Sequence, residues 1–129
     1  MTTTVYLAGG INGLSDSDAK DWREYAKERL NCDTLDPMRR DYRGKEDESV
    51  REIVHGDLAD IGSSDVILAS CVRPSWGTAM EIHYASYIAR KLVFAVVPEG
   101  QAISPWLRYY TEAVYQTFDE AIDAINRRA

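Results

Sequence analysis

The segment TTVYLAGG at residues 3–10 predicts a buried β-strand that ends at a turn. Its first six residues are mostly β-branched, aromatic or aliphatic, a composition that favours a strand inside a sheet. Gly9 and Gly10 follow at once, and glycine favours tight turns over regular structure. We therefore expect a first strand at residues 3–8, with a loop directly after it.

Strand and helix patterns alternate along the rest of the chain. Helical spacing of apolar residues covers residues 16–30, 48–62, 78–89 and 118–125, while short apolar runs occupy residues 32–35, 65–69, 92–97 and 114–117. Residues 104–110 are read as an aromatic loop or a short helix. Strands that are apolar throughout are typical of a parallel sheet covered on both faces. The sequence predicts one α/β domain over residues 1–129: a doubly wound, flavodoxin-like or Rossmann-like five-stranded parallel sheet with helices on both faces.

The bulk composition narrows the possible partners. The chain has 129 residues, a length that suits a single core, and a net charge of −6. A net negative charge repels polyanions, so we expect no nucleic-acid partner. No run approaches the ~20 apolar residues of a membrane span and no N-terminal targeting pattern is present, so we expect a cytoplasmic protein without membrane association. Cys32 and Cys71 are too few for a disulfide framework.

A glycine-rich loop follows the first predicted strand. In a doubly wound sheet, ligands bind beyond the carboxyl ends of the strands, where glycine lets a phosphate or sugar approach the backbone. The loop lacks the full spacing of a dinucleotide-binding fingerprint, and a tight strand-to-helix turn would use the same glycines. The candidate substrate-binding residues here are Gly9, Gly10, Ile11 and Asn12.

Two carboxylates carry the strongest chemical signal. Asp57 lies on the apolar stripe of the helix predicted at residues 48–62, so it should point inward, where an unpaired carboxylate is costly. Glu81 lies near the start of the next helix, where the helix dipole favours an anion. Each has a structural alternative, a buried salt bridge or a helix-start glutamate. Together they suggest glycoside chemistry, in which one carboxylate attacks the sugar and the other manages the leaving group's proton.

Other polar residues give weaker signals. Tyr6 on the first strand could hold Glu81 in position, or be part of the core. The charged loop that contains Asp36 and Arg39 follows the second strand and could close over a ligand, or be solvated. His55 and His83 lack partners at ligand spacing, so we expect no metal and no cofactor.

Three blocks of the sequence together resemble a known family. They are Tyr6-x-x-Gly-Gly-Ile-x-Gly, then Gly56-Asp57-Leu58-x-x-Ile61-x-x-Ser64-Asp65-Val66, then Pro74-Ser75-x-Gly77-Thr78-x-x-Glu81-Ile82. The pattern resembles the nucleoside 2-deoxyribosyltransferase superfamily, and within it the 2'-deoxynucleoside 5'-phosphate N-hydrolases. The resemblance implies that Glu81 is the nucleophile, that Asp57 assists departure of the base and that Tyr6 orients Glu81.

The resemblance also implies further site residues and an assembly. Ser75 replaces an aspartate common in the transferases, at a position where the hydrolases use serine near the substrate phosphate, which favours a nucleotide. Gly77, in the same block, is a further candidate substrate-binding residue. Ser104 resembles a serine that family members lend to the neighbouring subunit, which implies a homodimer or larger homo-oligomer. Two departures count against phosphate recognition: Asn12 stands where the hydrolases tend to have arginine, and His83 replaces a usual glycine.

Three functions follow from these observations. The leading one is hydrolysis of the N-glycosidic bond of 2'-deoxynucleoside 5'-monophosphates through a glycosyl-Glu81 intermediate. The second is transfer of deoxyribose from one base to another, which differs only in what resolves that intermediate. The third is a nucleotide-binding sensor that keeps the fold without catalysis, an interpretation that Asn12 and His83 keep open.

Overall fold

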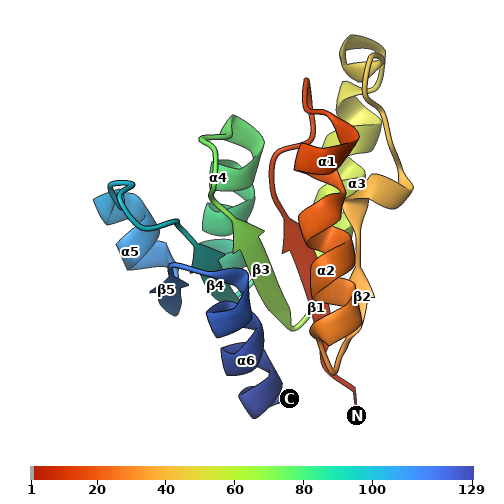
Figure 1. Cartoon of the computed structure of the whole chain (residues 1–129). Coiled ribbons are helices and arrows are strands. Elements are labelled where there is room, and N and C mark those ends of the chain that lie inside the picture. The colour runs from red at the N-terminus through yellow and green to blue at the C-terminus, as the bar shows by residue number, and fades with distance from the viewer. Residues whose placement is uncertain (1) are drawn as a thin grey trace.

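The computed structural model, which describes residues 2–129, contains a five-stranded sheet with helices on both faces (Figure 1). All strands are parallel, in the order β2-β1-β3-β4-β5. The strands are β1 (Thr4–Ala8), β2 (Asp33–Leu35), β3 (Val66–Ser70), β4 (Leu92–Val96) and β5 (Ala113–Tyr115). The order confirms the predicted doubly wound α/β fold.

The helices lie between successive strands, except the last helix, which follows the last strand. They are α1 (Asp16–Ala19), α2 (Asp21–Arg29), α3 (Val50–Gly62), α4 (Trp76–His83), α5 (Pro105–Tyr110) and α6 (Phe118–Arg128), with short 3-10 turns η1 (Pro37–Arg39) and η2 (Glu46–Glu48). A π-helical segment, η3 (Tyr84–Ile88), continues α4. Within residues 2–129, no helix combines the length and apolar character that a membrane span requires.

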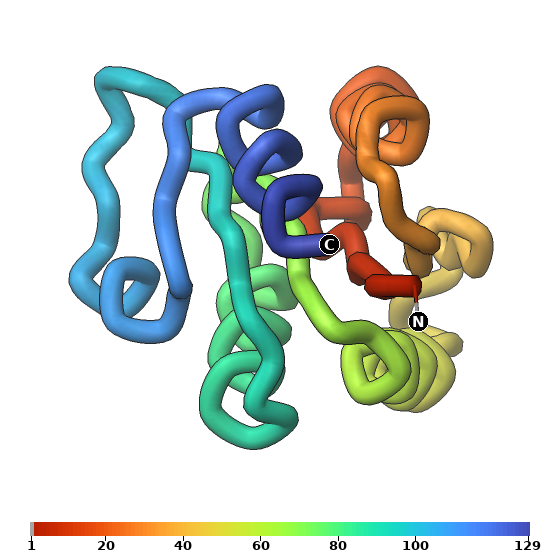
Figure 2. Tube along the Cα trace, turned by 90° about the horizontal axis from the view of Figure 1, so that it is seen from below, coloured from red at the N-terminus to blue at the C-terminus, as the bar shows by residue number. Residues whose placement is uncertain are grey.

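The two faces of the sheet carry separate halves of the core, because successive side chains of a strand point to opposite sides. Val5 and Leu7 of β1 pack with α2 and α6, whereas Tyr6 and Ala8 pack with α3 and α4. Figure 2, a view from below, shows the sheet between these two helical layers. Tyr6 therefore points toward the layer that contains Asp57.

Two of the differences from the predicted elements have a clear local cause. The first predicted helix is divided at Lys20 into α1 and α2, and at this break the Ala19 carbonyl accepts a hydrogen bond from the buried Arg23 guanidinium (2.5 Å). The last strand ends at Tyr115 rather than at Thr117, because the Thr117 side chain caps α6 in a capping box with Glu120.

Candidate active site

A cleft of about 530 Å³ lies beyond the carboxyl ends of β1 and β3. Such a volume suits a small organic ligand. Three parts of the chain form its walls: the loop after β1, one side of α3, and the loop after β3 with α4. The lining residues are Gly9, Gly10, Ile11, Asn12, Leu14, Ile53, Val54, Asp57, Leu58, Arg73, Pro74, Ser75, Gly77, Thr78, Met80, Glu81 and Tyr84. The two carboxylates that the sequence analysis paired, Asp57 and Glu81, thus share one cleft.

Glu81 projects from α4 toward β1, where the hydroxyl of the fully buried Tyr6 donates a hydrogen bond to its carboxylate. Burial raises the pKa of Glu81 to about 8, the nearby charge of Asp57 acts in the same direction, and the Tyr6 hydrogen bond opposes both. Burial, followed by the charge of Glu81, also raises the pKa of Tyr6, so its hydroxyl stays a donor. Tyr6 therefore orients Glu81 and favours its ionised form.

Asp57 is held from the opposite side by arginine. Burial raises the pKa of Asp57, and Arg40, whose Nη2 lies 3.3 Å from the Asp57 carboxylate, acts against that rise. The same Arg40 nitrogen lies 2.8 Å from Asp60, which Arg39 also binds through two hydrogen bonds of 2.8 Å each. A Cβ at position 56 would lie 2.9 Å from the Arg40 side chain, so Gly56 lets the guanidinium approach α3. Arg40 was not predicted as the partner of Asp57.

Packing requires the glycine turn after β1. A Cβ at position 9 would lie 2.7 Å from the Trp22 ring, a separation at which something must shift. The buried Arg23 side chain also donates to the carbonyls of Gly9 (3.0 Å) and Leu7 (3.2 Å), which fixes the backbone below the turn. Gly9 thus has a structural role and also lines the cleft, so the two interpretations of this glycine are compatible.

The loop after β3 places the first turn of α4 at the cleft. Ser75 is the N-cap, and its hydroxyl accepts a hydrogen bond from the Thr78 amide (3.3 Å). A Cβ at Gly77 would meet no heavy atom within 4 Å, so this turn is open on that side. The buried hydroxyl of Thr78 has no hydrogen-bond partner within residues 2–129. The positive end of the α4 dipole and Arg73 before it favour an anion here.

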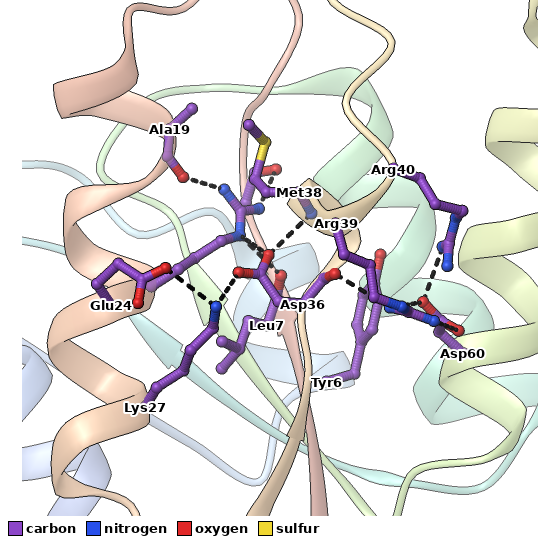
Figure 3. A network of polar contacts seen from close by, with 12 residues as sticks. Tyr6, Leu7, Ala19, Glu24, Lys27, Asp36, Met38, Arg39, Arg40 and Asp60 are labelled. Carbon is purple, nitrogen blue, oxygen red and sulfur yellow. Dashed lines mark hydrogen bonds and ion pairs between the residues drawn. The ribbon is translucent and has the colours of Figure 1, made fainter.

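Asp36 and Arg39, two predicted substrate-binding residues, are not among the residues that line this cleft. They belong to a network of polar contacts beside it (Figure 3). Asp36 is buried, accepts a hydrogen bond from the Met38 amide (2.8 Å) and pairs with Lys27 (2.6 Å). Arg39 is committed to Asp60. In this structure Asp36 holds the segment after β2 against α2, and Arg39 holds it against α3. Arg39 shares Asp60 with Arg40, the residue that supports Asp57.

Ser104, predicted to complete a neighbouring site, lies outside the cleft of its own chain. It caps α5, accepting a hydrogen bond from the Trp106 amide (3.2 Å), and lines a second cavity of about 490 Å³. This cavity is mostly apolar in character and shares the Arg73–Ser75 wall with the first. Its lining includes Trp76, Trp106, Leu107 and Tyr110.

Sequence reasoning also missed much of the cleft wall. Ile53 and Leu58 of α3 line the cleft, and neither was among the predicted site residues. Tyr84 lines it where α4 becomes the π-helical segment η3. The apolar spacing of α3 could have indicated this wall, since Asp57 lies on the same stripe, whereas no local pattern marks a π-helical segment in advance.

A doubly wound sheet with two carboxylates in the cleft at its carboxyl end defines a class of α/β protein equipped for nucleophilic and acid–base chemistry on a small ligand. Residues 5–124 match the family model described as nucleoside 2-deoxyribosyltransferase. The chain belongs to this family, whose members act on the N-glycosidic bond of nucleosides, by cleavage or by deoxyribosyl transfer.

Solved structures are similar across almost the full length of the chain. A 2-deoxyribosyltransferase from Bacillus psychrosaccharolyticus is 20% identical with a TM-score of 0.74, covering 96% of this chain and 91% of its own. A CMP N-glycosidase from Clostridium botulinum is 17% identical with a TM-score of 0.61, covering 96% and 99%. At these identities the likeness establishes the fold. No sequence among curated proteins matches the chain.

Proposed function

We propose that this protein hydrolyses the N-glycosidic bond of 2'-deoxynucleoside 5'-monophosphates through a covalent intermediate on Glu81. The observation that carries the proposal is that Asp57 and Glu81 line one cleft, where Glu81 accepts a hydrogen bond from the buried Tyr6. A carboxylate pair around one sugar is the arrangement by which retaining glycosidases divide nucleophilic and acid–base work.

In the first step, an ionised Glu81 oxygen attacks the anomeric carbon while the bond from that carbon to the base nitrogen breaks. The electron pair of that bond leaves with the base, which takes a proton from Asp57. Burial raises the pKa of Asp57, which favours the protonated form that this step needs. Tyr6 keeps the Glu81 oxygens aligned through its hydrogen bond.

In the second step, water attacks the same carbon and Asp57 takes the proton that the water loses. The carbon–oxygen bond to Glu81 breaks, which frees the carboxylate and releases the sugar phosphate. Apolar residues of α3 and α4, namely Ile53, Val54, Leu58 and Met80, give the cleft a wall that suits a flat nucleobase.

The second candidate is a deoxyribosyltransferase, favoured by the family match and by the B. psychrosaccharolyticus structure. The two activities share the Glu81 intermediate and differ in whether water or a second base resolves it. Adding a different free base to the reaction separates them. A new nucleoside or nucleotide indicates transfer, whereas base and free sugar product alone indicate hydrolysis.

We also propose that the protein acts as a homodimer or larger homo-oligomer in which Ser104 completes the site of a neighbouring copy. Large apolar side chains are exposed on α4 and α5, including Trp76 at 86%, Trp106 at 71% and Tyr109 at 80%. Contiguous exposed apolar surface on this scale is typical of an interface. Analytical ultracentrifugation of the parent chain and of Trp106→Ser tests this, since a parent that sediments as a monomer at micromolar concentration contradicts it.

The function itself is tested by incubating the protein with a panel of nucleosides and their monophosphates and separating the liberated bases by chromatography. We expect base release from deoxynucleoside monophosphates and none above background from Glu81→Gln. Circular dichroism establishes that this variant is folded. Tight nucleotide binding by the parent without any product would instead identify a sensor.

A further inference from the structure

We propose that Arg73 is the residue that makes this site prefer a phosphorylated substrate, by binding the 5'-phosphate. This inference rests on the proposed function and adds the group that determines its substrate class. A phosphate dianion entering this cleft meets two carboxylates, Asp57 and Glu81, in a chain whose net charge is −6. Binding it in preference to an uncharged nucleoside therefore needs a cation at the cleft.

Arg73 is the one basic side chain among the described residues that line the cleft. Three other arginines lie close by, and the fold already uses each of them. Arg23 is buried and donates to backbone carbonyls, Arg40 holds Asp57 and Asp60, and Arg43 is bonded to Asp16, Asp41 and the Leu14 carbonyl.

Arg73, by contrast, has most of its hydrogen-bonding capacity free. Its side chain is 58% exposed, and within residues 2–129 its ion pair is a single contact of 3.2 Å with Asp18. An exposed pair of this kind is weak, because water screens both charges. Asp18 thus holds the guanidinium beside the cleft, and a phosphate can replace Asp18 as its partner with little loss of binding energy. The phosphate oxygens match the planar fork of arginine.

The surroundings of Arg73 suit the same anion. Pro74 and Ser75 follow it directly, so the Ser75 hydroxyl and the positive end of α4 line the same wall of the cleft. Thr78, in the first turn of that helix, is 4% exposed and carries a hydroxyl without a partner among the described residues. Asn12, on the neighbouring glycine-rich loop, is uncharged, so among the residues of this chain that line the cleft the positive charge comes from Arg73.

The test compares Arg73→Gln with Arg51→Gln, a matched control that removes the same charge from an exposed position of α3 outside the cleft. Steady-state kinetics are measured for one deoxynucleoside monophosphate and for the corresponding nucleoside. We expect Arg73→Gln to raise the KM for the monophosphate by about tenfold to hundredfold, the usual range for losing a charge-assisted hydrogen bond. The KM for the nucleoside should stay within about twofold of the parent's value. Arg73→Lys should have a KM for the monophosphate between those of the parent and Arg73→Gln.

A binding measurement keeps this inference separate from the proposed activity. Calorimetry with Glu81→Gln, alone and combined with Arg73→Gln or with Arg51→Gln, measures the affinities for the monophosphate and for the nucleoside whether or not the protein cleaves them. A preference for the monophosphate over the nucleoside that is lost with Arg73 supports the inference, even if no substrate is cleaved. An equal preference in Arg73→Gln and Arg51→Gln overturns it, as does the absence of any preference in the parent.

Discussion

Replacing Tyr6 by phenylalanine removes one oxygen atom and the hydrogen bond to Glu81. The ring stays buried at the same place in β1, so the change acts mainly on the carboxylate. A hydrogen bond to a charged group contributes about 1.5–3 kcal/mol, and one pH unit corresponds to about 1.4 kcal/mol, so the pKa of Glu81 should rise by about one to two units.

The sign of the effect on activity follows from the ionisation that attack requires. With the Glu81 pKa at about 8, roughly a tenth of the parent enzyme has this carboxylate ionised near neutral pH. In Tyr6→Phe that fraction falls by about tenfold to hundredfold, because its titration moves to higher pH. The acid limb of kcat/KM should therefore shift upward by about one to two pH units, while the rate partly recovers in more alkaline buffer.

The assay is a pH profile of kcat/KM for base release, which reports the ionisations of the free enzyme. Tyr115→Phe is the matched control, since Tyr115 lies on β5 and packs against the face of the sheet away from the cleft. If the acid limb of Tyr6→Phe is not shifted, then this limb does not report a Glu81 carboxylate whose pKa is lowered by the Tyr6 hydrogen bond, and the reasoning is refuted.

Three further predictions concern the same site and its frame. Asp57→Asn should lower the rate of base release by about 10²–10⁴-fold, yet move the acid limb to lower pH, because a neighbouring negative charge that raises the pKa of Glu81 is removed. Gly9→Ala should lower the free energy of unfolding, measured in urea, by about 1–3 kcal/mol, since the new Cβ would meet the Trp22 ring. Gly62→Ala, whose Cβ would have no heavy atom within 4 Å, should raise that free energy by up to about 1 kcal/mol. The free energy of unfolding of the parent should fall between pH 4.5 and about 8, because the unfolded chain releases the Glu81 proton at lower pH than the folded chain does. Unfolding curves across this range should therefore show the stability of Glu81→Gln rising relative to that of the parent as the pH increases.

The central strands could be predicted from sequence because both of their faces are buried. β3 is buried throughout and nearly all of β1 and β4 is, which leaves an unbroken apolar run in each. The edge strands β2 and β5 have three residues each and are only partly buried, so their signal is weaker and the predicted end of β5 was displaced. Local patterns specify a buried strand better than a sheet edge.

α4 begins at Trp76, so Glu81 lies in its second turn and not, as predicted, near the start of the helix. That Asp57 and Glu81 share one cleft could nevertheless be predicted from helical spacing and a strand end. Their supporting groups could not. Arg40 reaches Asp57 from a loop 17 residues earlier in the chain, and Gly56 is the one local trace of that approach. Asp36 was expected to be free to bind a ligand because it follows a strand, but it forms an ion pair with Lys27 of α2. This pair exists only because α2 packs beside β2.

Arg73 illustrates the same limit for substrate recognition. A single arginine in a loop has no periodicity and no motif, so it carries no signal until the fold shows which neighbouring cations are already paired. The distribution of ion pairs, rather than the charge of any residue, distinguishes Arg73 from Arg23, Arg40 and Arg43.

The covalent step can be observed directly with a 2'-fluoro-substituted deoxynucleoside monophosphate. The electron-withdrawing fluorine destabilises the cation-like transition states of both steps, so the glycosyl ester accumulates when its hydrolysis is slower than release of the base. Mass spectrometry of the intact protein and of its peptides should find a fluoropentose phosphate on Glu81, and none in Glu81→Gln. Release of base with the sugar attached to another residue, or attached to none, would contradict a nucleophilic Glu81.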